Sequence, residues 1–113
     1  MAVKSYSVLI NNKINEFNKV INVDPDKSIS IRAFLIGSIS QGVSKISDAL
    51  LSEDVFSTIN CLRKLNCKII KKSKNKYEVF GKGLGSYYAK KNTLLNLGNS
   101  GTGLRLISSI IST

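Results

Sequence analysis

The sequence predicts one small α/β or α+β domain, because short strand-like apolar runs alternate with segments of helical spacing along its 113 residues. The predicted order is two strands, a helix, a strand, a helix, three strands and a final helix. A chain of this length provides one small domain and not two. No apolar run approaches the roughly 20 residues that a membrane span needs, so we expect no membrane partner.

The chain opens with two β-rich runs, residues 6–10 and 14–23, joined by asparagines that suit a turn. A helical period then extends over residues 26–39, and Asp24 or Asp26 is placed to cap that helix. The apolar spacing predicts one buried stripe on it, widened by Phe34 and Leu35. The stripe consists of Ile29, Ala33, Ile36 and Ile39.

Gln41-Gly42 is predicted to end this helix, and a short strand is expected over residues 43–46. A second helix is expected after Ser52, where Glu53-Asp54 place two acids in the first turn and complement the helix dipole. Asn66 is a predicted stop signal. The predicted buried face of this helix is Val55, Ile59, Leu62 and Leu65.

The remaining segments predict a hairpin, a turn, one more strand and a helix. Residues 67–71 and 76–80 are β-rich and are separated by a lysine-rich turn. Three glycines, at 81, 83 and 85, follow with the freedom to form a turn of positive φ. We expect a strand over residues 94–97, and a helix over residues 104–112 that is apolar on most faces, as a buried helix would be.

Composition excludes some chemistry and leaves the meaning of the charge open. The chain has 17 Lys and Arg, 7 Asp and Glu, a net charge of +10 and no His, which excludes imidazole ligands and bases from these residues. The excess lysines centre on residues 68–76, where a solvated turn is the favoured interpretation and a nucleic-acid surface is the alternative. Cys61 and Cys67 lack zinc-site spacing and are expected to be reduced core residues. With no signal peptide recognisable, the expected location is the cytoplasm.

Two predicted helix starts share a layout. Residues 26–32 and 99–105 each begin with a capping Asp or Asn, continue with small or hydroxyl residues, and reach an Arg six positions later. Ser28 and Arg32 lie on one helical face. Amide groups at a helix start, a hydroxyl and cations suit a phosphate or carboxylate. Spacing alone leaves ordinary helix capping as the stronger alternative, and Asp26 would oppose an anion.

At these residues the chain resembles the family of 5-enolpyruvylshikimate-3-phosphate (EPSP) synthases. Residues 26–33 match the core of the family's phosphate-binding string, and residues 97–102, followed by Arg105, match its second glycine motif. Further similar strings lie between the two motifs, and the resemblance covers about residues 20–113. The strings are Asp26-Lys27-Ser28-Ile29-Ser30-Ile31-Arg32-Ala33 and Leu97-Gly98-Asn99-Ser100-Gly101-Thr102.

The resemblance implies transfer of the enolpyruvyl group of phosphoenolpyruvate to the 5-hydroxyl of shikimate 3-phosphate, with release of phosphate, on the route to chorismate and the aromatic amino acids. It implies no metal and no organic cofactor. Both substrates are small anions, and the whole enzyme is expected to be monomeric and to bind no nucleic acid. The implied ligands of shikimate 3-phosphate are Lys27, Ser28 and Arg32. Those of phosphoenolpyruvate are Lys27, Asn99, Gly101 and Thr102, and Arg105 is assigned to structural support.

The implied fold is a set of βαβαββ units in an incomplete inverse α/β barrel. Residues 1–22 would be strands that pair with the other domain, residues 23–113 would be the first part of the N-terminal domain, and the C-terminal domain would be absent. No catalytic residue is assigned, because the acid and base carboxylates belong to that second domain, so 113 residues alone are expected to be inactive. The sequence departs from the family pattern at Asp24-Pro25, Ile31 and Gly103.

Three other interpretations stay open at this point. The related UDP-N-acetylglucosamine enolpyruvyltransferases share the implied fold and chemistry, but their first motif carries Asn where this chain has Ser28. Neither Cys61 nor Cys67 fits their catalytic loop. A small basic nucleic-acid-binding module belongs to a different class, and a degenerate, inactive relative of the synthase is the third.

Overall fold

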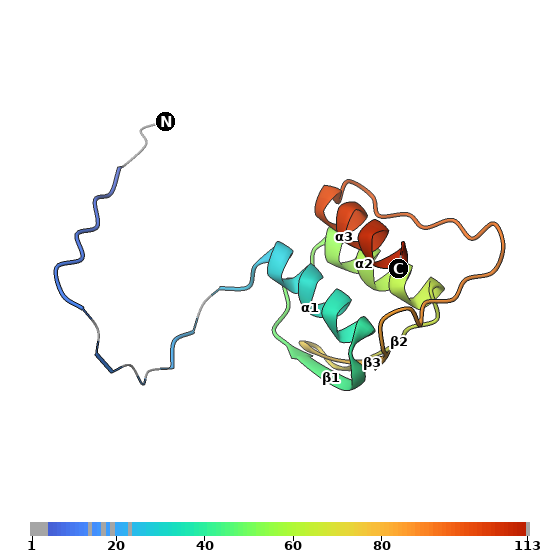
Figure 1. The fold of residues 1–113 in the computed structure, drawn as a ribbon, viewed down its shortest axis with the longest axis horizontal. Helices are drawn as coiled ribbons and strands as arrows, with labels where there is room; N and C mark the ends of the chain where they lie inside the picture. Colours follow the sequence, from blue (N-terminus) through green and yellow to red (C-terminus); the bar gives the residue numbers. More distant parts are fainter. Residues whose placement is uncertain (1–4, 14, 17, 19, 23, 113) are drawn as a thin grey trace.

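Two helices lie on one face of a three-stranded antiparallel sheet and a third packs against the first of them in the computed structural model of this chain, which describes residues 5–13, 15, 16, 18, 20–22 and 24–112 (Figure 1). The sheet order is β1-β3-β2, and β3 pairs with both neighbours. This α+β arrangement confirms the predicted class, with fewer strands than predicted. The elements are α1 (Lys27–Ile39), β1 (Gln41–Ser47), α2 (Glu53–Lys64), β2 (Lys68–Ser73), β3 (Lys76–Lys82) and α3 (Gly101–Ile111).

Helix α1 starts as predicted but buries a different face. Asp26 is its N-cap and accepts a 2.8 Å hydrogen bond from the Ile29 amide. The predicted stripe is wrong at Ile29 and Ile36, which are 66% and 60% exposed, whereas Phe34 is fully buried. The helix is apolar on most sides, so spacing does not select its inner face. The sheet does, because the Phe34 ring packs edge-on against Tyr77 of β3 with 5.5 Å between centroids.

Gly81 lets the end of α1 lie directly on β3. A Cβ at this position would overlap the carbonyl oxygens of Gly37 and Ser40. Gly81 lies within the strand, so its predicted role in a turn is wrong and its function is close approach. The turn prediction is confirmed for Gly83 and Gly85, whose φ angles are +99° and +81°. The α1–β3 contact therefore depends on one missing side chain.

Strand β1 begins two residues earlier than predicted. Gln41-Gly42, expected only to end the helix, pair with Lys82 and Gly81 of β3. The helix already ends at Ser40, whose backbone amide and hydroxyl both donate to the Ile36 carbonyl. Hydrogen bonding to β3 thus extends the strand back to the end of the helix, although Gln41 and Gly42 have no strong local preference for a strand.

Helix α2 and the hairpin agree with prediction. Ser52 stands at the N-cap position of α2, although its side chain makes no cap hydrogen bond. Asn66 ends the helix with a φ of +67°. Strands β2 and β3 form the expected hairpin, and its lysines are exposed, which supports the solvated-turn interpretation. The predicted helix face is buried throughout, at Val55, Ile59, Leu62 and Leu65.

Two predicted strands are absent from the described residues. Residues 6–10 are exposed and belong to no strand, because a strand needs a neighbour to bond with and none lies beside them (Figure 1). The predicted strand over residues 14–23 falls partly on residues that lie outside the described set. Residues 94–97 also form no strand; they lie along α2 and receive hydrogen bonds from its side chains.

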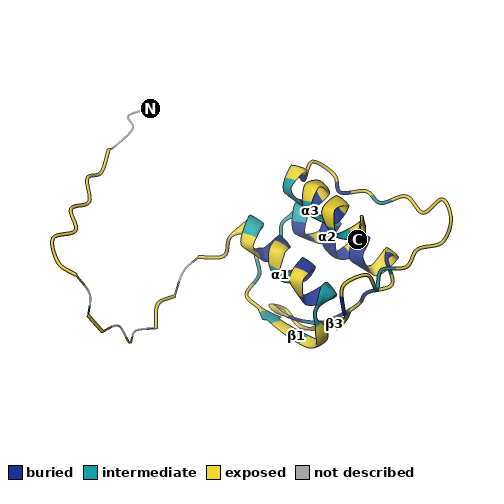
Figure 2. Ribbon diagram, in the orientation of Figure 1, coloured by how far each residue is buried: buried dark blue, intermediate teal, exposed yellow. Residues whose placement is uncertain are grey.

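Helix α3 is a surface helix, contrary to the prediction of a buried one. It starts at Gly101, three residues before the predicted start. Within it Gly103 and Ile107 are buried, while Leu104 and Ile111 are 57% and 47% exposed. Figure 2 shows the buried residues gathered where the helices and the sheet face one another. None of the helices in the described part of the chain has the length and apolar character to cross a bilayer.

Replacing Gly81 by Ala should destabilise the domain by about 3 kcal/mol, because the new Cβ would overlap two backbone carbonyls that cannot move alone. Gly85→Ala is the matched control: its Cβ meets open space, and only the positive φ costs about 1 kcal/mol. Urea unfolding of the chain and of each variant measures the difference. Equal loss of stability in the two variants would contradict the close-approach role of Gly81.

Both cysteines should react slowly with a thiol reagent while the chain is folded. Desolvation on burial raises the pKa of the Cys61 and Cys67 thiols, although Lys64 and Lys82 respectively act in the opposite direction. Less thiolate and less access should slow the reaction with Ellman's reagent at pH 8 by about tenfold or more relative to the urea-unfolded chain. Fast reaction of both thiols in the native chain would contradict this.

Candidate functional site

The first candidate motif forms the exposed start of α1. Lys27 is the first residue of the helix, Ser28 is half-buried, and Arg32 lies exposed one turn later. The Lys27 ammonium pairs with the Asp54 carboxylate at 3.0 Å between Nζ and Oδ2, and the two side chains are 48% and 19% exposed. The cation is therefore held in place at the helix start and still faces solvent.

Asp54 is the site residue that sequence reasoning missed. The sequence predicts only an acid that complements the dipole of α2, and its first-turn position supports that role as well. Its pairing with Lys27 depends on α1 and α2 starting at the same end of the domain, which the intervening strand makes possible (Figure 1). No local signal in the sequence reports that alignment.

Ser30, the second serine of the motif, has a structural role. Its buried Oγ accepts a 2.9 Å hydrogen bond from the Leu50 backbone amide. Leu50 precedes α2 by three residues, so this bond ties the first turn of α1 to the segment that leads into α2. The bond stabilises the alignment that lets Lys27 reach Asp54.

The second motif forms the start of α3, with a cap that differs from the prediction. Ser100, and not Asn99, is the N-cap: its Oγ accepts a 3.0 Å hydrogen bond from the Gly103 amide. The two helix starts are therefore not equivalent, since Arg32 stands six residues after its cap and Arg105 five. The Arg105 side chain nevertheless extends back over the first turn of α3. A Cβ added to Gly101 would lie 3.5 Å from its Nη1 atom.

The two motifs meet at the start of α2. A cavity of about 390 Å³ is lined there by Asp54, the partner of Lys27, and by Asn99 of the second motif. Gly98 also lines this cavity, and a Cβ added to it would lie 3.6 Å from the Ser57 hydroxyl oxygen. The other lining residues are Glu53, Phe56, Ser57 and Asn60.

The structure thus brings some predicted site residues together and leaves others apart. Lys27 contacts Asp54 in the first turn of α2, and Asn99 lines the same cavity as Asp54. Ser28 and Arg32 extend along α1, and Gly101 and Thr102 begin α3; none of these four lines that cavity. All of them lie within the first two turns of a helix.

Electrostatics at this end favour an oxyanion at the helix starts and not inside the cavity. Three helix N-termini gather here, each with amides that lack intrahelical partners (Figure 1). Inside the cavity the carboxylates of Glu53 and Asp54 oppose an anion, and only Asp54 is paired with a cation in the described structure. Among the described residues, no group of three or more His, Cys, Asp or Glu could hold a metal ion.

Comparison with known proteins agrees with this architecture. A family model described as EPSP synthase (3-phosphoshikimate 1-carboxyvinyltransferase) matches residues 11–113. A protein of that name from Thermoanaerobacter sp. strain X514 is 48% identical over 93 residues, which is 82% of this chain and 21% of the relative. One from Bacillus cytotoxicus is 45% identical over 95 residues, covering 84% of this chain and 22% of the relative.

The fold is similar to that of a solved relative. The structure of the EPSP synthase from Acinetobacter baumannii superimposes with a TM-score of 0.71 at 29% identity, over 81% of this chain and 21% of the other. The chain spans about a fifth of the length of the relatives it matches. On the extent of the family match and the identity to these relatives, the chain belongs to the EPSP synthase family.

Proposed function

We propose that this chain contributes part of the substrate-binding surface of an enzyme that transfers the enolpyruvyl group of phosphoenolpyruvate to the 5-hydroxyl of shikimate 3-phosphate. The observation that carries the proposal is the convergence of both family motifs on the start of α2, where Asp54 pairs with Lys27 and lines a cavity together with Asn99. Family membership supports the choice of reaction.

Shikimate 3-phosphate is assigned to the start of α1. A phosphate there would meet the first-turn amides, the Ser28 hydroxyl and the Arg32 guanidinium, which can form two parallel hydrogen bonds to oxyanions. The Asp26 carboxylate already accepts from the Ile29 amide, so a phosphate here would use the remaining first-turn amides together with Ser28 and Arg32. Lys27 is assigned to both substrates on the family resemblance, and its pairing with Asp54 keeps its ammonium at the helix start.

Phosphoenolpyruvate is assigned to the start of α3. Gly101 and Thr102 are the first residues of that helix, and Asn99 stands just before its cap. The Arg105 guanidinium beside Gly101 adds a cation to this end. We retain the assignment of Arg105 to support of the site, since its position there favours an anion without requiring contact with it.

The reaction needs more than the residues described above. An acid must protonate the methylene carbon of phosphoenolpyruvate while the 5-hydroxyl oxygen, losing its proton to a base, bonds to the carbon that carries the phosphate. That methyl group must then give up a proton, so that the double bond re-forms as the C–O bond to phosphate breaks and phosphate leaves. Lys27, Ser28 and Arg32 would orient the acceptor, and the α3 start would orient the donor. The Asp54 carboxylate is committed to Lys27 and is no free base. We assign the acid and base to residues outside this chain.

The alternative functions gain no support from the comparisons. The matching family and the relatives reported above are EPSP synthases, which favours neither a UDP-N-acetylglucosamine enolpyruvyltransferase nor a nucleic-acid-binding module. A cytoplasmic location, a monomeric whole enzyme and the absence of a nucleic-acid partner stay predictions that rest on the resemblance and the composition.

The proposal is tested in a chimera in which this chain replaces the matching segment of the Thermoanaerobacter relative. The chimera should produce phosphate from shikimate 3-phosphate and phosphoenolpyruvate in a coupled assay. Lys27→Ala in the chimera should lower kcat/KM by about 100-fold or more, because a cation placed against both anions is lost. Lys45→Ala, an exposed lysine on β1, is the matched control and should have little effect.

Two results would contradict the proposed function. One is a folded chimera without turnover when Lys27 is intact. The other is equal activity of the Lys27→Ala and Lys45→Ala chimeras. The first would argue against the reaction, whereas the second would argue against the site.

Arg32 provides a test on the chain itself. Titration with shikimate 3-phosphate, followed by NMR, should shift the amide signals of the first turn of α1 before those of the sheet. Arg32→Ala should weaken this binding by about tenfold, since a charge-assisted bidentate contact to phosphate is lost. Lys74→Ala in the lysine-rich turn should leave it unchanged. Equal weakening by both variants would indicate nonspecific attraction to a basic chain.

A further inference from the structure

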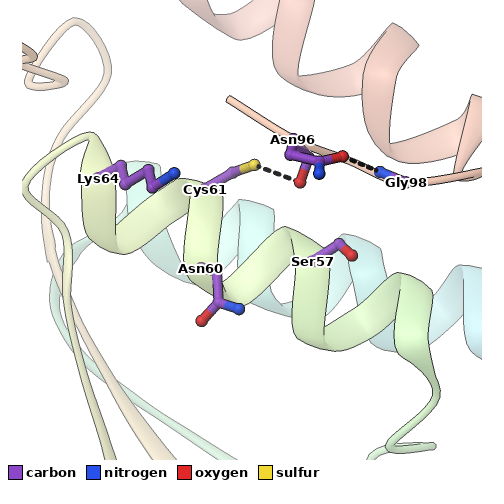
Figure 3. A pocket seen from close by; sticks show the side chains of 6 residues that line it. All are labelled: Ser57, Asn60, Cys61, Lys64, Asn96 and Gly98. Atoms are coloured by element: carbon purple, nitrogen blue, oxygen red, sulfur yellow. Dashed lines mark hydrogen bonds between the residues drawn. The ribbon is translucent and has the colours of Figure 1, made fainter. Parts of the chain in front are cut away.

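The segment that leads into the second motif is held by the side chains of α2. Residues 83–100 form no strand, so no ladder fixes their path. The Lys64 ammonium donates to the Leu94 carbonyl at 3.1 Å, and the Cys61 thiol donates to the Asn96 carbonyl at 3.3 Å. Figure 3 shows Cys61 projecting from α2 toward Asn96. The backbone before the motif is thus attached to the helix at two successive places.

Asn96 then turns the chain toward the motif. Its side-chain Oδ1 accepts a 2.9 Å hydrogen bond from the Gly98 amide (Figure 3). Gly98 has a φ of +58°, a left-handed conformation that residues with a Cβ rarely adopt. The adjacent Leu97 is buried in the core, and its carbonyl accepts from the Ser100 amide. Together these contacts determine where Asn99 lies and where α3 begins.

Leu97 anchors this segment in the core, while hydrogen bonds from Cys61 and Lys64 hold its backbone on the side that faces α2. A cavity of about 470 Å³ lies between the helix and the segment, lined by polar groups and the edge of Cys61. Because this side is not filled by side chains, loss of a bond leaves room for the segment to move. Its lining is Ser57, Asn60, Cys61, Lys64, Asn96 and Gly98.

The same helix therefore orients both motifs. Its first turn holds Lys27 through Asp54, and its last turns hold the segment before Asn99 through Cys61 and Lys64. A rigid helix between these contacts keeps the two motifs at a constant separation. We propose that Cys61 and Asn96 are positioning residues that hold Asn99 and Gly101 in place for the phosphoenolpyruvate side of the site, an inference that rests on the proposed function.

The first test needs no ligand and uses the whole chain. Asn96→Ala should speed amide hydrogen exchange at Gly98 by about tenfold, while the amides of Phe34 and Leu35 in the core keep their protection. Asn96→Asp retains an acceptor for the Gly98 amide and should restore slow exchange. Asn60→Ala is the matched control, because Asn60 lines the same cavity without a hydrogen bond to the segment in the described structure.

The second test separates positioning from general stability. Phosphoenolpyruvate and shikimate 3-phosphate are titrated in turn against the chain. Asn96→Ala and Cys61→Ala should weaken phosphoenolpyruvate binding by about fivefold or more and leave shikimate 3-phosphate binding unchanged, since the α1 start keeps its own contacts. Cys61→Ser retains a donor toward the Asn96 carbonyl and should restore much of the loss.

Each outcome decides one of the two hypotheses. Unchanged exchange at Gly98 in Asn96→Ala would overturn the positioning role, whatever the ligands do. Equal weakening for both substrates would overturn it as well, and would indicate a structural effect. Faster exchange without any phosphoenolpyruvate binding by the unmodified chain would leave the mechanical role standing, and the proposed function would be contradicted if the chimera then also lacked turnover.

Discussion

The contact between α1 and β3 at Gly81 is the constraint on which the rest of the structure depends. Without a side chain there, the carbonyls of Gly37 and Ser40 rest directly on the strand. This close approach selects the inner face of a helix that is apolar on most sides. It also sets the direction of α1, so that Lys27 points toward the start of α2.

From that constraint the site is organised around α2 and not around either motif. Asp54 in its first turn pairs with Lys27, and Cys61 and Lys64 near its C-terminal end donate hydrogen bonds to the segment before Asn99. Among the described residues no hydrogen bond joins the two motifs, yet both are held by the same helix. This explains why Asp54, Cys61 and Asn96 matter although none stands in a motif that resembles a phosphate site.

The positive charge separates into two populations with different surroundings. The lysines of the β2–β3 hairpin are exposed, and two of them make local contacts within it. Lys72 pairs with Glu78 at 3.3 Å, and Lys68 lies over the Phe80 ring at 4.9 Å from its centroid. Lys27 and Arg32 stand at a helix start, where the dipole adds to their charge. Net charge alone could not distinguish these groups, because it carries no information about position.

The sequence by itself determined the elements with strong local signals: the Asp26 cap, the buried face of α2, the hairpin and the family motifs. Tertiary structure decided what depends on neighbours. It chose the buried face of α1, extended β1 to Gln41, left residues 94–97 without a strand, and paired Lys27 with Asp54. Caps and periodicity act within a few residues, whereas ladders, close approaches and ion pairs join segments far apart in the chain.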